Sequence, residues 1–375
     1  MEYKLLTPGP LTTTMAVKEQ MLFDHCTWDD DYKQITCRIC DGLLRLGHVS
    51  APEYTAVLMQ GSGTFGVESV LTSVIGADEK VLIAANGAYG LRMTDICRHA
   101  GIACTLYEQP NTLQPDAAHI AELLDADPSI THVSMVHSET TSGILNDIEA
   151  VGKVVKAAGK TFIVDAISSF GGVDIPVADY GIDFLISGAN KCIQGVPGFA
   201  FILARREKLE QSRGKARSLS LDLYEQWKSM NADDKWRFTS PTHAVMAFAK
   251  AMEEELEQEG GIPVRHARYA ANQRLLALWF GEMGFKPYLD PSVQAVVKVG
   301  DTVSDIREGR NAGVRSLGVL EGSSVMGMTQ AAYEALSAEK KQAALDRVRQ
   351  VFLEAGADDV LLNIKQLPAW IQAND

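Results

Sequence analysis

The sequence predicts an α/β protein built on a mostly parallel, doubly wound sheet with helices on both faces. The first observation behind this prediction is that apolar runs of strand length alternate with patterns of helical period. The second is that most of these runs lead directly into a helical pattern, as in the βα units of parallel sheets. The predicted strands are Tyr54–Met59, Lys80–Ala84, Ile102–Tyr107, His132–Val136, Thr161–Val164, Asp183–Ser187 and Phe199–Ala204.

The length, composition and charge of the chain limit the class of protein and the partners that it can have. The chain has 375 residues, of which 46% are hydrophobic and 22% charged, enough for two domains or for one large α/β domain with an appendage. The net charge of −13 disfavours a nucleic acid or an anionic membrane as a partner. No run reaches the length of a membrane span and the N-terminus lacks a signal-like apolar segment, so we expect a soluble, cytoplasmic protein.

The six cysteines are scattered along the chain, as in proteins of a reducing compartment. Cys37 and Cys40 form a CxxC pattern, which formally fits a redox or zinc site. We interpret them instead as part of one face of a helix over Gln34–Leu46, because no second CxxC or histidine pair completes a metal site.

Two charged residues follow apolar runs near the middle of the chain. Asp165 comes directly after Thr161–Val164, and Lys191 comes shortly after Asp183–Ser187. In an open α/β sheet, ligands bind at the carboxyl ends of such strands. A lysine and an aspartate that converge there suit pyridoxal phosphate, which needs an amine for a covalent bond and an acid to keep its pyridine nitrogen protonated.

A simpler interpretation of this pair is a solvated surface lysine and a helix-capping aspartate. However, Lys191 is the only charged residue between Asp183 and Arg205. An amine with so apolar a setting has its charged form disfavoured by loss of water, which makes it a better nucleophile. We therefore prefer the cofactor interpretation.

Several loops carry chemistry that suits a phosphorylated, planar cofactor. Residues 60–66 (QGSGTFG) join a strand to a helix and could offer backbone amides to a phosphate, although an ordinary tight turn can look the same. Tyr89 follows a strand and could stack on a ring or belong to the core. Residues 137–143 (HSETTSG) hold more polar side chains than helix capping requires. The basic, hydroxyl-rich loop 235–243 (KWRFTSPTH) could bind an anion in its own subunit or across a dimer interface.

Taken together, these stretches resemble one family. TPGPLT, TWDDDY, LMQGSGTFGVESVL, NGAYG, MVHSETTSGILN, FIVDAISSFGG, ANKCIQGVPGFAF, SLSLDLYEQW and KWRFTSPTHAV are similar to the motifs of 2-aminoethylphosphonate:pyruvate aminotransferases. These enzymes belong to the alanine–glyoxylate aminotransferase branch of the fold-type I pyridoxal-phosphate enzymes. The resemblance extends over roughly Tyr3–Phe285. It implies a homodimer that acts on the small molecules 2-aminoethylphosphonate and pyruvate.

The resemblance also implies a role for each matching residue. Lys191 would bond covalently to pyridoxal phosphate and transfer the proton, and Asp165 would pair with the pyridine nitrogen. The other cofactor-binding residues implied in this way are Ser62, Gly63 and Thr64 at the phosphate, Tyr89 stacked on the ring, Thr140 near the ring hydroxyl, and Thr239 or Thr242 reaching a phosphate from the partner subunit.

The C-terminal part departs from this family, and we predict a boundary between residues 1–287 and residues 288–375. The family's small domain supplies an arginine that grips the carboxylate of the keto acid, and no matching strand follows Phe285. The chain instead reads AVVKVGDTVSDIREGR. This resembles the C-terminal part of phosphonoacetaldehyde hydrolase, of the haloacid-dehalogenase superfamily, and implies a short α/β segment of that type. Asp301 and Asp305 would then be Mg²⁺ ligands, with helix capping by Asp301 as the alternative.

This tail leaves several functions open. We expect a pyridoxal-phosphate-dependent aminotransferase, impaired if the carboxylate-binding arginine is truly lost, with a different amine donor as a variant. The alternatives are a Mg²⁺-dependent phosphonatase, for which the sequence offers no matching nucleophilic aspartate, and an inactive fusion remnant. Three basic residues of the tail are candidates for the missing group, with none assigned: Arg307, Arg310 and Arg315.

Overall fold

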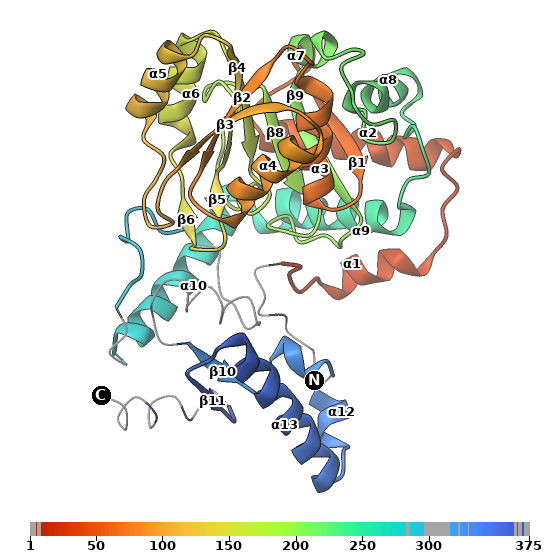
Figure 1. Cartoon of the computed structure of the whole chain (residues 1–375). Coiled ribbons are helices and arrows are strands. Elements are labelled where there is room, and N and C mark those ends of the chain that lie inside the picture. The colour runs from red at the N-terminus through yellow and green to blue at the C-terminus, as the bar shows by residue number, and fades with distance from the viewer. Residues whose placement is uncertain are drawn as a thin grey trace. The chain divides into compact units, whose positions relative to one another are not determined.

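The computed structural model divides the chain into two compact units (Figure 1). It describes Leu5, residues 9–282, 286–295, 316–321, 323–328 and 330–363, and also Gln366 and Trp370. The larger unit comprises Thr13–Asn272 and Tyr288–Val297. The smaller unit comprises Met1–Thr12, Gln273–Pro287 and Lys298–Asp375.

The larger unit is organised around a seven-stranded sheet with the order β1-β9-β8-β7-β4-β2-β3. Of these strands, β9 alone runs against the others: it pairs antiparallel with β1 and β8, whereas the remaining pairs are parallel. The prediction of a mostly parallel sheet is confirmed. The strands are β1 (Tyr54–Gln60), β2 (Lys80–Ala85), β3 (Ala103–Glu108), β4 (Ile130–Val136), β7 (Thr161–Asp165), β8 (Phe184–Gly188) and β9 (Phe199–Arg205).

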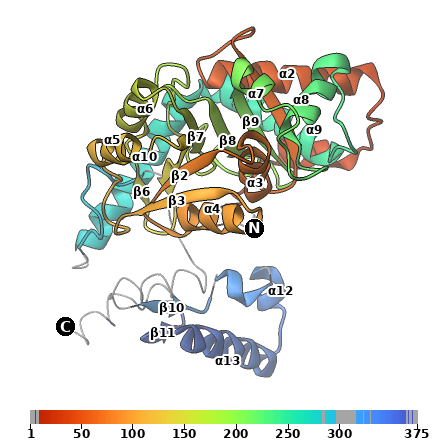
Figure 2. The same cartoon turned by 45° about the horizontal axis from the view of Figure 1, so that its top comes forward.

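Helices cover both faces of this sheet (Figures 1 and 2). Side chains alternate along β9, so Phe199 and Phe201 point to one face, where their ring centroids lie 5.0 and 5.7 Å from that of Phe248 in α9. Ala200 points to the other face, where a Cβ added to Gly66 of α3 would lie 2.7 Å from the Cβ of Ala200. Burial on both sides explains why the strands read as nearly continuous apolar runs.

The other elements of the larger unit are helical, apart from the short hairpin of β5 (Ser138–Glu139) and β6 (Ile144–Leu145). None of the helices in the described residues is long and apolar enough to cross a membrane. The helices are α1 (Met15–Glu19), η1 (Gln20–Leu22), α2 (Asp30–Leu46), α3 (Gly63–Val74), α4 (Ala88–His99), α5 (Ala117–Ala126), α6 (Ile148–Ala157), α7 (Arg206–Gln211), α8 (Leu223–Asp233), α9 (Thr242–Glu253), the π-helical η2 (Glu254–Glu259) and α10 (Ile262–Glu282), which continues into the smaller unit.

The smaller unit has a core of its own. Its strands β10 (Leu317–Val319) and β11 (Asp359–Leu361) are parallel, and η3 (Ser324–Met326), α12 (Gln330–Glu334) and α13 (Ala338–Ala355) lie between them in sequence. Val348 and Phe352 of α13 are buried there, and a Cβ added to Gly318 would lie 2.7 Å from the ring of Phe352.

The motif that resembles the hydrolases falls between these described parts of the smaller unit. Asp301 and Asp305 lie outside the described residues, and so do the basic residues Arg307, Arg310 and Arg315. Within the part of the chain that the structure describes, no three His, Cys, Asp or Glu side chains gather in a way that could hold a metal ion.

Candidate active site

Two adjacent parallel strands bring Asp165 and Lys191 to the same pocket. Strand β7 ends at Asp165, and β8 ends at Gly188, three residues before Lys191. Both side chains line a cavity of about 200 Å³ at the carboxyl ends of the strands. The remaining lining residues are Ser62, Gly63, Thr64, Val67, Tyr89, Arg92, Met93, Ile96, Val136, Ser138, Ile167, Ser168 and Asn190.

Asp165 is an acid in a buried, hydrogen-bonded position. It is 5% exposed, and its Oδ1 accepts a hydrogen bond of 2.9 Å from the amide of Ile167. Burial raises the pKa of this carboxyl to about 7, and the Ile167 amide partly offsets the rise. A cationic group beside Asp165 would stabilise the carboxylate and bring its pKa down again. The protonated nitrogen of a pyridine ring is such a group, so this position fits the cofactor.

Lys191 is the matching amine. Burial lowers its pKa, and the charges of Cys192 and Asp165 oppose this shift. A lower pKa means a larger fraction of neutral amine, which is the nucleophilic form. The amine therefore has the chemistry needed to bond to an aldehyde within the same pocket as Asp165.

The loop after β1 forms the part of the pocket suited to a phosphate. Ser62 stands at the N-cap of α3, and its hydroxyl makes no hydrogen bond to the helix. The first residue of the helix is Gly63, where an added Cβ would lie 2.6 Å from Cδ1 of Ile167. Free amides at a helix N-terminus, with no side chain in the way, are a good cradle for an anion.

Tyr89 enters the pocket from the N-terminus of α4, and Glu139 holds that terminus in place. Oε2 of Glu139 accepts hydrogen bonds from the amides of Tyr89 at 3.1 Å and Gly90 at 3.3 Å. Oε1 accepts one from the Thr141 hydroxyl at 2.6 Å. Glu139 is fully buried. The polar run at residues 137–143 thus contains the acid that positions Tyr89, a role that the sequence did not indicate.

Arg92 is a pocket residue that sequence reasoning missed. Its Nη1 donates to the Thr64 hydroxyl at 3.3 Å, and its guanidinium carbon lies 4.7 Å from the centre of the Tyr89 ring. Its spacing of three residues from Tyr89 on the same helix was the available signal. Ser138, Ser168 and Asn190 also line the pocket without having been singled out.

Three of the predicted cofactor-binding residues lie elsewhere in the described chain. Thr140 is buried beside Glu139 but is not among the residues that line the cavity. Thr239 is exposed, and Thr242 is half-buried at the start of α9. The single chain therefore brings together Ser62, Gly63, Thr64, Tyr89, Asp165 and Lys191, and leaves these three threonines outside.

Helix α10 holds the loop that carries Lys191. Nη1 of Arg265 donates to the carbonyl oxygen of Cys192 at 2.7 Å. The side-chain Nε2 of Gln194 donates to the hydroxyl of Tyr269 at 2.7 Å. The backbone amide of Gln194 donates to the carbonyl oxygen of Lys191 at 2.8 Å. The contacts of Arg265 and Tyr269 join residues more than 70 positions apart in the chain, so only the tertiary structure reveals them.

A half-buried amine and a buried acid in one pocket, beside a glycine-lined anion cradle on this fold, define a pyridoxal-phosphate-dependent transferase. Comparison with known proteins specifies its kind. The profile of the family described as "Aminotransferase class-V" matches residues 48–275. The chain belongs to the class-V aminotransferase family and is a pyridoxal-phosphate-dependent aminotransferase.

Similar proteins with assigned names agree with this family. A 2-aminoethylphosphonate–pyruvate transaminase from Lysinibacillus sphaericus is 56% identical over 295 residues, which are 79% of this chain and 80% of that protein. A transaminase of the same name from Klebsiella pneumoniae is 55% identical over 297 residues, with the same two shares. The family resemblance noted from the sequence motifs is thus confirmed for the aminotransferase part of the chain.

Solved structures share the fold. The alanine–glyoxylate aminotransferase of Nostoc sp. superposes with a TM-score of 0.74 and 18% identity, over 95% of this chain and 96% of that one. The pyridoxamine–pyruvate aminotransferase of Mesorhizobium loti gives a TM-score of 0.73 and 24% identity, over 100% and 97% of the two chains. The expectation of a fold-type I aminotransferase fold is confirmed.

Proposed function

We propose that the protein transfers the amino group of 2-aminoethylphosphonate to pyruvate and so forms phosphonoacetaldehyde and alanine. The observation that carries this proposal is the meeting of Lys191, Asp165 and the Gly63 cradle in one cavity. The choice of substrates is supported by relatives that are 53 to 56% identical over most of their length and bear this activity in their names.

Each pocket residue has a defined task in this reaction. Pyridoxal phosphate, when bound, supplies a ring that accepts the electron pair left after a proton is lost from the substrate. Lys191 would hold the cofactor through its amine, and as a free amine it would accept and return the substrate proton. Asp165 would keep the ring nitrogen protonated, and Tyr89 would stack on the ring. Thr140, which does not line the cavity of the single chain, would lie near the ring hydroxyl if the cofactor extends beyond that cavity.

The cofactor phosphate binds where α3 begins. Ser62, Gly63 and Thr64 offer a hydroxyl pair and helix-terminal amides at this point. Thr239 or Thr242 adds a donor from the partner subunit of a homodimer. The surface near these threonines supports a dimer because large apolar side chains are exposed there and on the N-terminal segment: Phe23, Trp28, Leu219 and Phe238.

Arg92 is our candidate for gripping the anionic end of a substrate. Apart from Lys191, it is the cationic side chain among the residues that line the pocket. A guanidinium presents several donors in one plane, which suits a phosphonate or a carboxylate. Arg92 can therefore supply part of the carboxylate binding that the family's C-terminal arginine would otherwise provide.

We further propose that the chain joins an aminotransferase segment, residues 1–287, to a segment of haloacid-dehalogenase type, residues 288–375. The support is the sequence around Asp301 and Asp305, together with the parallel pairing of β10 and β11, which suits an α/β segment. Titration of the full-length protein with MgCl₂ by calorimetry, with Asp301→Asn as the comparison, tests the two aspartates as ligands.

The six free cysteines support a cytoplasmic location.

A product assay tests the proposed function. Purified protein loaded with pyridoxal phosphate is given 2-aminoethylphosphonate and pyruvate, and alanine and phosphonoacetaldehyde are measured separately. The proposal expects equal amounts of both products, and neither when one substrate is omitted. Turnover of pyruvate with another amine, but not with 2-aminoethylphosphonate, would reject the substrate and keep the aminotransferase.

A further inference from the structure

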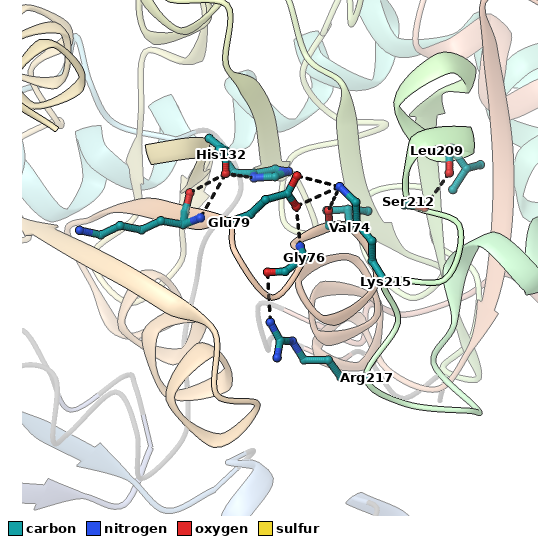
Figure 3. A network of polar contacts seen from close by, with 10 residues as sticks. Val74, Gly76, Glu79, His132, Leu209, Ser212, Lys215 and Arg217 are labelled. Atoms are coloured by element: carbon teal, nitrogen blue, oxygen red, sulfur yellow. Dashed lines mark hydrogen bonds and ion pairs between the residues drawn. The ribbon is translucent and has the colours of Figure 1, made fainter. Parts of the chain in front are cut away.

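A second cavity opens at the opposite edge of the sheet from the active site. It has a volume of about 260 Å³ and lies where β2, β4, β7 and β8 begin, whereas the active site lies where these strands end. Figure 3 shows the polar network at its wall, with Lys215 pointing toward Glu79 and the ring of His132 close by. The lining residues are Val74, Glu79, Thr131, His132, Gly159, Lys160, Thr161, Phe184, Lys208, Gln211 and Lys215.

The charges around this cavity do not balance. Lys215 is paired with Glu79, with Nζ at 2.8 and 2.9 Å from the two carboxylate oxygens. Lys160 donates to the carbonyl oxygen of Pro128 at 3.1 Å, and Lys208 has no ion-pair or hydrogen-bond partner among the described residues. Three ammonium groups and one carboxylate leave a net charge of +2, in a chain whose overall charge is −13.

Two nearby acids outside the lining are already paired with other cations, and a third, Glu207, accepts a hydrogen bond of 3.2 Å from the lining residue Gln211. Asp183, whose charge acts on Lys208, is paired with Arg205 at 2.9 Å. Asp127, next to the start of β4, is paired with Lys80 at 2.7 Å. The side chains that line the cavity therefore keep an excess of positive charge.

His132 adds a buried group that can change its role. It is 5% exposed, and its Nδ1 lies 2.8 Å from the hydroxyl of Thr131. The Thr131 hydroxyl also lies 3.0 Å from the carbonyl oxygen of Lys80, so its one proton can serve both contacts only if Nδ1 of His132 is the donor in theirs. Nε2 is then an acceptor in the neutral ring and becomes a donor only when the ring is protonated.

The surroundings of His132 favour the neutral form of its ring. Burial is the main cause that lowers the pKa of its imidazole to about 4; Glu79 opposes this shift, and the ammonium groups of Lys215 and Lys208 add to it. An anion in the cavity would cancel the field of the lysines and accept a hydrogen bond from Nε2, so it would favour protonation.

We propose that this cavity binds a small tetrahedral dianion, of the phosphate or phosphonate type, between Lys160, Lys208, Lys215 and His132. A dianion matches the net charge of +2, and its several oxygens can accept from Lys160, Lys208 and a protonated His132. Lys215 contributes its charge, since its Nζ already donates to both carboxylate oxygens of Glu79 and, at 3.4 Å, to the carbonyl oxygen of Val74. A water molecule takes up about 30 Å³ of liquid, so the cavity has room for such an anion and several waters. The site is separate from the catalytic pocket and does not depend on the proposed reaction.

Isothermal titration of the cofactor-loaded, full-length protein with inorganic phosphate, at constant ionic strength in chloride, tests the site. We expect Lys208→Gln to weaken this binding about tenfold, since it removes a charge that faces the anion. Lys153→Gln is the matched control: it removes the same charge from α6, where Lys153 is exposed and paired with Glu149. It should bind phosphate as the wild type does.

Phosphate can also enter the catalytic pocket, so a signal from His132 itself decides where it binds. The histidine side-chain resonances are recorded by NMR during the titration, and His132→Gln assigns the relevant peak. The proposal expects the His132 peak to shift toward the protonated form with phosphate in the wild type and in Lys153→Gln, and much less in Lys208→Gln. A His132 peak that does not respond, or an equal response in all three proteins, would overturn it. Methylphosphonate as a second titrant shows whether the site takes phosphonates as well as free phosphate.

Discussion

The guanidinium of Arg265 donates a hydrogen bond of 2.7 Å to the carbonyl oxygen of Cys192, the residue that follows Lys191. Arg265 is 2% exposed and also lies 3.0 Å from the carboxylate of Glu255, which is fully buried. A buried side chain that is paired on both sides has little freedom to move. Helix α10 thereby sets the position of the loop that presents Lys191.

Replacing Arg265 with lysine should lower kcat roughly 10- to 100-fold, because lysine keeps the charge but cannot bridge Cys192 and Glu255 in the same geometry. The test is steady-state kinetics together with a pH titration of the visible absorbance of the bound cofactor. A shifted midpoint in that titration shows a displaced amine, which a mere loss of folded protein would not produce.

The matched control for this change is Arg268→Gln. Arg268 is partly exposed and pairs at 2.8 Å with Glu259, which also pairs with Arg265 at 2.7 Å. Removal of Arg268 breaks one ion pair of this group and leaves the hydrogen bond from Arg265 to Cys192 in place. We expect nearly unchanged kcat and an unchanged titration midpoint. Equal losses in both variants would mean that the ion pairs of α10 only stabilise the fold.

The pKa of Asp165 makes the stability of the cofactor-free protein depend on pH. Burial raises this pKa to about 7, above the ordinary value of about 4. The folded state then holds the proton more tightly than the unfolded state, so the associated stability is fully present below about pH 4 and is lost as the pH rises through about 7.

Asp165→Asn should remove this dependence. Between about pH 5 and pH 8 the melting temperature of the cofactor-free wild type should fall relative to that of the variant, and thermal melts at several pH values measure the difference. With cofactor bound, the variant should be less active than the wild type, because asparagine cannot hold the ring nitrogen protonated. A difference in melting temperature between wild type and variant that stays the same at every pH would contradict the raised pKa of Asp165.

Much of this site could be predicted from the sequence because the ends of the strands can be recognised from the ends of the apolar runs. Asp165 and Lys191 follow apolar runs, and adjacent parallel strands bring such positions together. The reversed direction of β9 could not be predicted, since an apolar run carries no sign of its direction. Arg92 and Arg265 were missed because an arginine on a helix has the same sequence context whether it faces solvent, a pocket or another loop.

Gly63→Ala should weaken cofactor binding about tenfold. The new methyl group would lie 2.6 to 3.2 Å from three carbons of Ile167, and overpacking of this kind costs about 1–3 kcal/mol. The dissociation constant for pyridoxal phosphate is measured by titrating the cofactor-free protein. Gly281→Ala, also on a helix but with nothing within 4 Å of the added carbon, should bind the cofactor normally. Normal binding by Gly63→Ala would argue against the cradle.

Arg92→Gln should raise the KM for 2-aminoethylphosphonate about tenfold and change kcat less, because a charge-assisted contact to the substrate is lost. Steady-state kinetics with each substrate varied in turn provides the measurement. Arg98→Gln, on the same helix, serves as the comparison, since Arg98 pairs with Asp95 at the surface at 2.6 Å. If Arg92→Gln has wild-type KM values for both substrates, Arg92 is not the anion-binding group.

The most direct test of the central claim is to locate the cofactor on the chain. Reduction of the loaded protein with sodium borohydride fixes a carbon–nitrogen double bond between cofactor and lysine, and peptide mass spectrometry then finds the modified residue. We predict a single pyridoxyl group on Lys191, and none in Lys191→Ala. Modification of a different lysine, or of none in the wild type, would contradict the account.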